Sequence, residues 1–254
     1  MKITVLGCSG SVPGPDLPTS GYLVEADGFG IVVDIGAGTF GKLQTHCSPF
    51  DVDAVLLSHL HLDHCADFAA LTTFRRQHPR PPYDPRVRKL PVHAPTGASV
   101  RLANAHAASR SEPESLEDVF EFSTLRPGEF RLGPFTVVVA RMRHICEAYG
   151  FRFEFGGRSL VFSGDTAACP ELVELARGAD VLMADTAWQD RGSRPDNLHM
   201  SGREAAEIAT EAGVERLLLT HVLPWSDRDA VLADAVRVFP GRSSLVEQDA
   251  VYDV

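Results

Sequence analysis

Residues 59–64 read His-Leu-His-Leu-Asp-His and place three imidazoles and one carboxylate within six positions. They follow the apolar stretch 54–58, so the polar run begins where a buried strand is predicted to end. Inside a core, each of these polar groups would need its own partner, and an unpaired one is costly. Zinc takes neutral imidazole nitrogen and carboxylate oxygen as ligands. The run therefore predicts a metal site, with a solvated histidine-rich turn as the alternative interpretation.

Three other apolar segments also lead to a residue of a type that binds metals. Three residues separate one of them from His144, two residues separate another from Asp165, and His221 directly follows the last. The carboxyl ends of strands are where α/β sheets commonly place their ligands. Taken singly, each histidine is more simply a hydrogen-bonded structural residue, and the aspartate a turn former. Beside 59–64, we interpret all three as further metal ligands.

The whole chain alternates apolar strands with short amphipathic helices, without a break that would divide its 254 residues. We therefore expect an α/β protein with a single domain over residues 1–254. The predicted strands are 2–6, 21–25, 30–34, 54–58, 91–94, 134–140, 150–155, 159–163, 180–184, 215–220 and 243–247. The predicted helices are 66–76, 170–177, 202–212 and 227–238, with Gly178 just past the second, a capping box from Ser201 to Glu204 and Asp227 as a further cap. Residues 77–91, rich in proline and arginine, are predicted to form an exposed loop.

The composition narrows the class of protein. Hydrophobic residues make up 44% of the chain and charged residues 23%, which is ordinary for a soluble globular protein. We expect neither a signal peptide nor a membrane span, and the five scattered cysteines are interpreted as reduced thiols of a cytoplasmic protein. The net charge of −10 disfavours stable nucleic-acid binding, because phosphate contacts dominate that affinity.

The run at 59–64 matches the H-x-H-x-D-H signature of the metallo-β-lactamase superfamily. The resemblance covers essentially the whole chain and includes the early strand aspartate of that family at Asp34. It implies a four-layer αββα sandwich with the metals at one edge between two sheets. It also implies two zinc ions per chain, with manganese and iron as alternatives. The implied ligands are His59, His61 and His144 for one ion and Asp63, His64 and His221 for the other, with Asp165 shared between them.

Within this superfamily, the sequence is most similar to the tRNA 3′-processing ribonucleases (RNase Z) and their phosphodiesterase relatives. Segments 6–13 and 199–209 carry the similarity. A His-Glu-Ala-Thr segment of those enzymes is represented here by Ala-Asp-Thr-Ala at 184–187, which keeps the acid as Asp185.

A second departure from RNase Z concerns the substrate. Bacterial members insert a long tRNA-gripping arm between the residues that correspond to His144 and Asp165, and here that interval has room only for two strands and a turn. The missing arm and the acidic charge favour a small phosphodiester over tRNA. In detail, the chain looks most like an actinobacterial branch associated with cyclic-nucleotide phosphodiesterase activity.

The implied reaction is attack on the phosphodiester by a hydroxide that bridges two zinc ions. Asp63 is a candidate to orient the hydroxide, and His199, oriented by Asp185, is a candidate to protonate the leaving oxygen. The alternative for His199 is a helix-entry residue without chemistry. Arg75 and Arg76 are weak candidates for phosphate binding, with a solvated charged face as the alternative.

Two other functions stay open at this point. One is an RNase Z-type ribonuclease that works without the arm. The other is a hydrolase of a lactone, thioester or aryl sulfate, or a metal-binding protein that has lost its activity. The resemblance favours a homodimer, and the sequence leaves open whether 3′,5′ or 2′,3′ cyclic linkages are preferred. We expect a small nucleotide as the substrate and, because no apolar run is long enough for a membrane span, no membrane partner.

Overall fold

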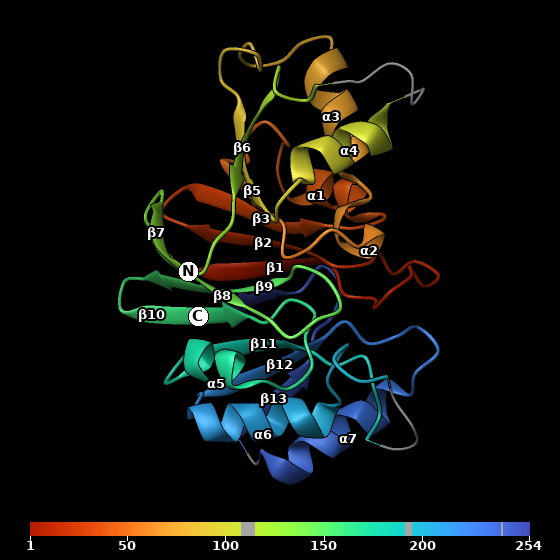
Figure 1. Cartoon of the computed structure of the whole chain (residues 1–254), viewed down its shortest axis with the longest axis vertical. Helices are drawn as coiled ribbons and strands as arrows, with labels where there is room; N and C mark the ends of the chain where they lie inside the picture. Colours follow the sequence, from red (N-terminus) through yellow and green to blue (C-terminus); the bar gives the residue numbers. More distant parts are fainter. Residues whose placement is uncertain (108–114, 191–194, 240) are drawn as a thin grey trace.

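Most strands are apolar runs that are buried on both faces, which is why they stand out as near-continuous hydrophobic segments. The computed structural model describes residues 1–107, 115–190, 195–239 and 241–254. Within these ranges, fourteen strands form two seven-stranded sheets (Figure 1). The first sheet is, in spatial order, β14 (Val251–Asp253), β1 (Lys2–Gly7), β2 (Gly21–Ala26), β3 (Phe29–Ile35), β4 (Ala54–Leu56), β5 (Leu90–Ala94) and β6 (Phe120–Thr124). The second is β13 (Arg242–Leu245), β12 (Arg216–Thr220), β11 (Val181–Asp185), β10 (Arg158–Phe162), β9 (Tyr149–Phe155), β8 (Phe135–Arg141) and β7 (Gly128–Leu132).

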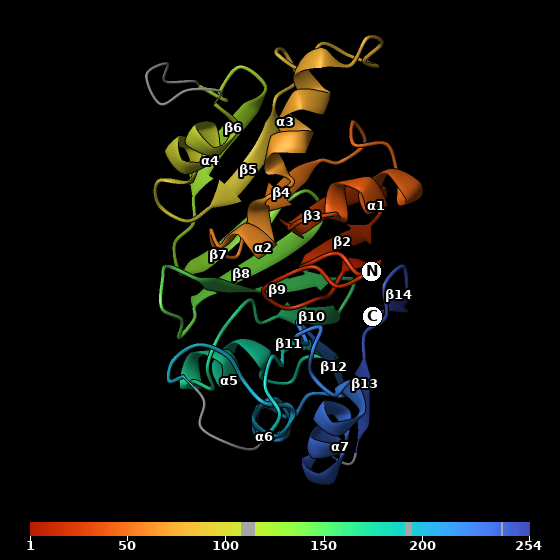
Figure 2. The ribbon, with the colours of Figure 1, turned by 90° about the vertical axis from the view of Figure 1, so that its right-hand side faces the viewer.

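Helices cover the outer face of each sheet (Figures 1 and 2). On the first sheet these are α1 (Thr39–His46), α2 (Leu62–Cys65), α3 (Phe68–Gln77) and α4 (Ala98–His106). On the second they are α5 (Pro170–Ala176), α6 (Gly202–Ala212) and α7 (Arg228–Val238). None of the helices in the described part of the chain is long and apolar enough to cross a membrane.

Three apolar layers hold this arrangement together. Val33 of β3 faces the core between the sheets, whereas the adjacent Val32 faces the core beneath α1, α3 and α4. Likewise, Leu218 of β12 faces the central core and Leu217 packs toward α5 and α6. Successive side chains thus alternate between two buried layers, as a strand requires. The result is the predicted four-layer αββα sandwich.

Each sheet has a parallel half, and this sets the position of the functional residues. Strands β3 to β6 run parallel to one another, as do β10 to β13. Because parallel strands bring their carboxyl ends to one edge, the segments that follow β4, β10 and β12 begin at a common edge of the sandwich.

The sequence located every element that is rich in buried apolar residues, and the predicted helix caps are present. Ser201 forms a capping box with Glu204, Asp227 accepts a hydrogen bond from the Ala230 backbone, and Gly178 has a positive φ of 62°. The helix predicted at 66–76 is instead a short turn of helix, α2, followed by α3. Residues 78–89 contain neither helix nor strand and are mostly exposed, as predicted.

The elements that the sequence missed lack a clear apolar period. Strands β6 and β7 lie at the sheet edges with several exposed side chains, and β14 is three residues long. Helices α1 and α4 each follow a glycine with positive φ, Gly38 and Gly97, and neither has a side-chain cap. A short edge strand and a helix without a polar cap give little signal to a period-based prediction.

Candidate metal centre

The predicted ligands lie at the edge where strands of both sheets end. The run 59–64 follows β4 of the first sheet and leads into α2. His144, Asp165 and His221 follow β8, β10 and β12 of the second sheet. The central apolar core ends here, and side chains from both sheets meet.

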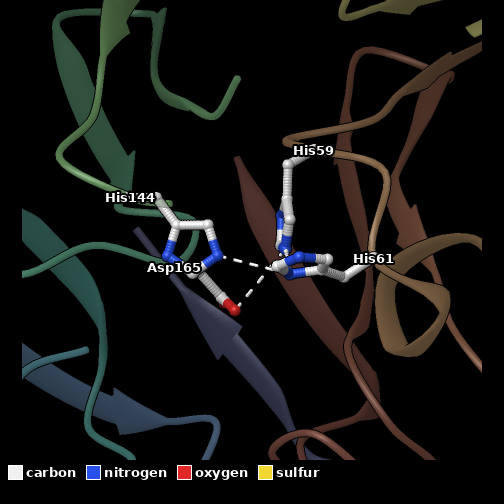
Figure 3. Close-up of side chains that lie close together, drawn as sticks. All are labelled: His59, His61, His144 and Asp165. Carbon is white, nitrogen blue, oxygen red and sulfur yellow. Dashed lines mark hydrogen bonds and ion pairs between the residues drawn. The ribbon is translucent and has the colours of Figure 1, made fainter. Parts of the chain in front are cut away.

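The seven predicted ligands form two groups of four that share one residue. In each group the candidate ligand atoms all lie within 4.8 Å of one another. Figure 3 shows the first group, with its side chains directed toward one another. Each group takes two residues from the first-sheet side and two from the second. The groups are His59, His61, His144 and Asp165, and Asp63, His64, Asp165 and His221.

The first group has the donor chemistry of a metal site. The Nδ1 of His144 lies 2.9 Å from the Leu198 carbonyl, which can only accept, so this nitrogen carries the proton. In the neutral ring, Nε2 is then a bare lone pair, and it lies 3.3 Å from Nδ1 of His61. The Nε2 of His59 is only 2.9 Å from the same His61 nitrogen. Three imidazoles that converge on one point fit a bound cation.

The second group shows the same pattern. His64 donates through Nδ1 to the Asp34 carboxylate at 2.7 Å, which leaves Nε2 as the inner lone pair of the neutral ring. That nitrogen lies 3.3 Å from Nε2 of His221 and 3.1 Å from Oδ1 of Asp165. The geometry therefore fits a second cation, with Asp165 between the two groups.

The pKa shifts in the cluster follow from burial and from the carboxylates. Burial lowers the pKa of His59, His61 and His144, so these rings are neutral and offer lone pairs. Burial acts in the same sense on His64, but Asp165 and Asp34 raise its pKa above the ordinary value. Against burial, Asp165 and Asp185 raise the pKa of His221 to about 10. A divalent cation would take the place of these protons.

One carboxylate outside the ligand set supports both groups. Asp34 is fully buried and accepts hydrogen bonds from His64 Nδ1 and from the Ser58 hydroxyl, both at 2.7 Å. Because the Ser58 hydroxyl donates its hydrogen to Asp34, its oxygen accepts the hydrogen bond from His59 Nδ1 at 3.1 Å. Asp34 therefore fixes the ring of His64 directly and that of His59 through Ser58. The sequence had singled out Asp34 by resemblance alone and had not singled out Ser58.

This arrangement predicts a defect in metal binding when the hydroxyl is removed. Ser58→Ala should weaken metal binding about 10- to 100-fold, the usual cost of losing a residue that orients a ligand. The measurement is competition with a chelator, followed by counting the metal retained. Ser243→Ala on β13 removes a hydroxyl away from the cluster and should retain metal like wild type. Equal retention in Ser58→Ala and wild type would show that the Ser58 hydroxyl does not orient His59.

Backbone geometry also adapts this edge to the cluster. Asp34 and His221 both adopt positive φ, 57° and 59°, which is uncommon for residues other than glycine. Such conformations persist only where the surroundings fix them, and they concentrate at functional sites. At Gly36 a Cβ atom would lie 1.9 Å from the Asp63 carbonyl oxygen, so only glycine lets the two loops approach this closely.

His199 and Asp185 lie beside the second group. The Nδ1 of His199 is 2.8 Å from Oδ2 of Asp185, and Trp188 packs against the same ring edge-on at 5.5 Å between centroids. Asp185 also approaches His221, with Oδ1 3.2 Å from Nδ1. The sequence predicts that Asp185 orients only His199, whereas in the structure its carboxylate lies between His199 and His221. Although burial opposes it, Asp185 raises the pKa of His199.

The two weak phosphate-binding candidates are occupied by structural contacts. Arg75 is 1% exposed, donates to the Arg88 carbonyl at 2.9 Å, and lies over the rings of Phe50 and Tyr83. Arg76 pairs with Asp118 at 2.8 Å. Arg75 therefore anchors the 78–89 loop, and Arg76 ties α3 to the segment before β6. The sequence signal was a cluster of positive charge, which does not distinguish an anchoring arginine from one that binds ligands.

A four-layer αββα sandwich with a histidine and aspartate cluster at one edge defines a metal-dependent hydrolase. The beta-lactamase superfamily domain matches residues 30–222 of this chain. The chain belongs to this family, the metallo-β-lactamase superfamily.

Relatives cover the whole chain. An uncharacterized protein of Mycobacterium leprae is 43% identical over 257 residues, which span 100% of this chain and 89% of that protein. The ribonuclease Z of Mycobacterium marinum is 31% identical over 267 residues, covering 96% of this chain and 95% of the enzyme. Among solved structures, the metallo-beta-lactamase fold protein YhfI of Bacillus subtilis superposes with a TM-score of 0.86 at 26% identity, covering 99% of both chains.

Proposed function

We propose that the protein is a binuclear zinc phosphodiesterase that hydrolyses small phosphodiesters, cyclic nucleotides above all. The observation that carries the proposal is the pair of ligand groups joined at Asp165, with His199 held next to them by Asp185. Two bound zinc ions would supply an activated water and positive charge for the phosphate oxygens. The remaining chemistry falls to side chains of this chain.

Two of these side chains have distinct roles in the proposed reaction. Asp63 is fixed by the Ser11 backbone N–H, which donates to its Oδ2 at 3.0 Å, and this places a carboxylate where it can orient the attacking water. His199 is fixed through Nδ1, so its Nε2 is the ring nitrogen left to protonate the leaving oxygen. An alkoxide leaving group needs such a donor.

The short segment between two of the ligands supports a small substrate. Between His144 and Asp165 the chain forms only β9, β10 and the turn at Gly156 and Gly157. This leaves no arm of the kind with which bacterial RNase Z grips tRNA, and the chain carries a net charge of −10. Because the sequence is 31% identical to the ribonuclease Z of Mycobacterium marinum, tRNA processing is the second candidate function.

A substrate panel tests the proposal. Zinc-loaded protein should hydrolyse bis(p-nitrophenyl) phosphate and either 3′,5′- or 2′,3′-cyclic AMP, and should act poorly on a lactone and on precursor tRNA. Metal analysis of the same sample should give two zinc ions per chain. Efficient, site-specific cleavage of the tRNA 3′ end at physiological salt would favour the ribonuclease, and efficient lactone hydrolysis would favour a non-phosphate esterase.

A further inference from the structure

A cavity of about 340 Å³ adjoins the metal centre, and His61 forms part of its wall. It lies between the turn that leads from β5 into α4 and the loop that joins β8 to β9. Its volume falls in the range of roughly 300–1,000 Å³ that is typical of small-molecule sites. A substrate that reaches the metals can therefore place a second part of its structure here. Its other main lining residues are Leu60, Pro95, Arg101, Cys146 and Glu147.

Glu147 presents a fixed carboxylate to this cavity. Its Oε1 accepts hydrogen bonds from the Thr96 backbone N–H and hydroxyl, both at 3.2 Å, and from the Tyr149 hydroxyl at 2.8 Å. Although burial opposes it, these hydrogen bonds lower the pKa of Glu147, so the group is ionised. The described residues form no hydrogen bond to Oε2, which is left to accept from a ligand.

Arg101 adds a cation to the lining of the same cavity. Arg101 projects from α4 and is exposed, and its guanidinium makes no hydrogen bond or ion pair with the described residues. A guanidinium is planar and stacks on aromatic faces. Leu60, Pro95 and Cys146 add apolar surface to a lining that is otherwise polar.

This combination fits a nucleobase better than a second phosphate. The carboxylate of Glu147 would repel a phosphate, whereas a lining of mixed polarity with a guanidinium that can stack and one free acceptor oxygen matches a planar heterocycle with an amino group. We propose that the cavity binds the base of the nucleotide substrate, with Arg101 stacked on its plane and Glu147 accepting from its amino group. The inference rests on the proposed function. It specifies adenine, guanine or cytosine over uracil, because uracil flanks its ring N–H with two carbonyl oxygens.

A larger cavity lies elsewhere in the described residues and serves as a control. It measures about 680 Å³, lies beside the β9–β10 turn, and contains none of the predicted site residues. Its arginines already have partners: Arg158 pairs with Asp180, and Arg152 with Glu154 at 2.7 Å. Arg158 does not line the cavity beside His61, so a substitution there is a control for the loss of an arginine elsewhere in the protein.

Two variants of the full-length, zinc-loaded protein test the inference. Glu147→Gln keeps an oxygen for Thr96 and Tyr149 but replaces the free acceptor with a donor, and Arg101→Met removes the guanidinium at similar length. The kcat/KM for cyclic AMP should fall about tenfold in each, because a hydrogen bond to a charged group or a stacked cation contributes about that factor. The preference of the wild type for cyclic AMP over cyclic UMP should shrink in Glu147→Gln. Hydrolysis of bis(p-nitrophenyl) phosphate, which has no base, should stay within about twofold of wild type, and Arg158→Met should behave like wild type on all three substrates.

The possible outcomes separate this inference from the proposed function. Equal losses on cyclic AMP and bis(p-nitrophenyl) phosphate would overturn base binding and leave the phosphodiesterase intact. If the wild type hydrolyses no phosphodiester, the proposed function fails, and calorimetric binding of AMP decides the inference alone. Binding that is weakened in Glu147→Gln and Arg101→Met but not in Arg158→Met would support the site. No binding, or equal binding in all four proteins, would overturn it.

Discussion

Asp165→Asn should abolish turnover and reduce the zinc content from two ions per chain to one or none. Asp165 is 2% exposed and belongs to both ligand groups. Its Oδ1 lies 3.1 Å from His64 Nε2, and its Oδ2 lies 3.6 Å from His59 Nε2. Asparagine keeps one oxygen and loses the charge, so it cannot serve two cations in this way. No other single side chain is shared between the groups, and we therefore expect the largest effect here.

The loss of metal should also lower stability, because metal that binds only the folded protein stabilises it. Metal analysis and thermal unfolding of Asp165→Asn should therefore change together, and chelation of the wild type should shift its unfolding temperature in the same direction. Asp229→Asn makes the same change at an exposed position of α7 and should resemble wild type. Full activity with one zinc ion or none would contradict the binuclear mechanism.

His199→Ala should reduce kcat by a factor of about 10² or more on a cyclic nucleotide while leaving both metals in place. The ring lies outside the two ligand groups that contain the 59–64 residues, although with Asp165, Asp185 and His221 it forms a third cluster of potential ligands. If the metals occupy the two groups of predicted ligands, removal of the ring should leave zinc content and thermal stability near wild type. The loss should be large for the ribose alkoxide and small for p-nitrophenolate, which departs without a proton. The measurement is kcat on both substrates with zinc counted in each preparation, and His46→Ala on α1 is the control.

Two results would require another role for His199. Equal losses on both substrates with full zinc would assign it to phosphate binding, and loss of zinc would make it a ligand. Asp185→Asn should differ from His199→Ala, because Asp185 also contacts His221. In Asp185→Asn, kcat should fall more on the cyclic nucleotide than on the p-nitrophenyl substrate, and the protein should also retain less metal.

The residues that could be predicted from the sequence are those with unusual local chemistry. Three histidines and an aspartate in six positions have few explanations other than a metal, and apolar strands that end in His144, Asp165 and His221 carry the same information at a distance. The division into two groups came from the family resemblance, and the structure brings the residues together accordingly.

The contacts that support the ligands could not be predicted, because they depend on which segments meet in space. Ser58 is an ordinary serine in sequence, and only the approach of β3 to β4 places it between Asp34 and His59. Nothing in the sequence around Glu147 marks it as a site residue, because its carboxylate is positioned by the turn at Thr96, which is distant in the chain. For Arg75 the prediction is wrong in the opposite direction. Its charge beside a loop suggests an accessible phosphate-binding residue, whereas the side chain is buried among aromatic rings.

Each ligand group draws two residues from the segment after β4 and two from the ends of second-sheet strands. Neither half of the sandwich therefore supplies all the ligands of an ion. An ion is released only when the ligands from one half dissociate from it. If local opening at this edge precedes release, the rate at which a chelator removes zinc measures how often the two sheets part there. Metal-release kinetics would then report on motion between the two sheets at this edge.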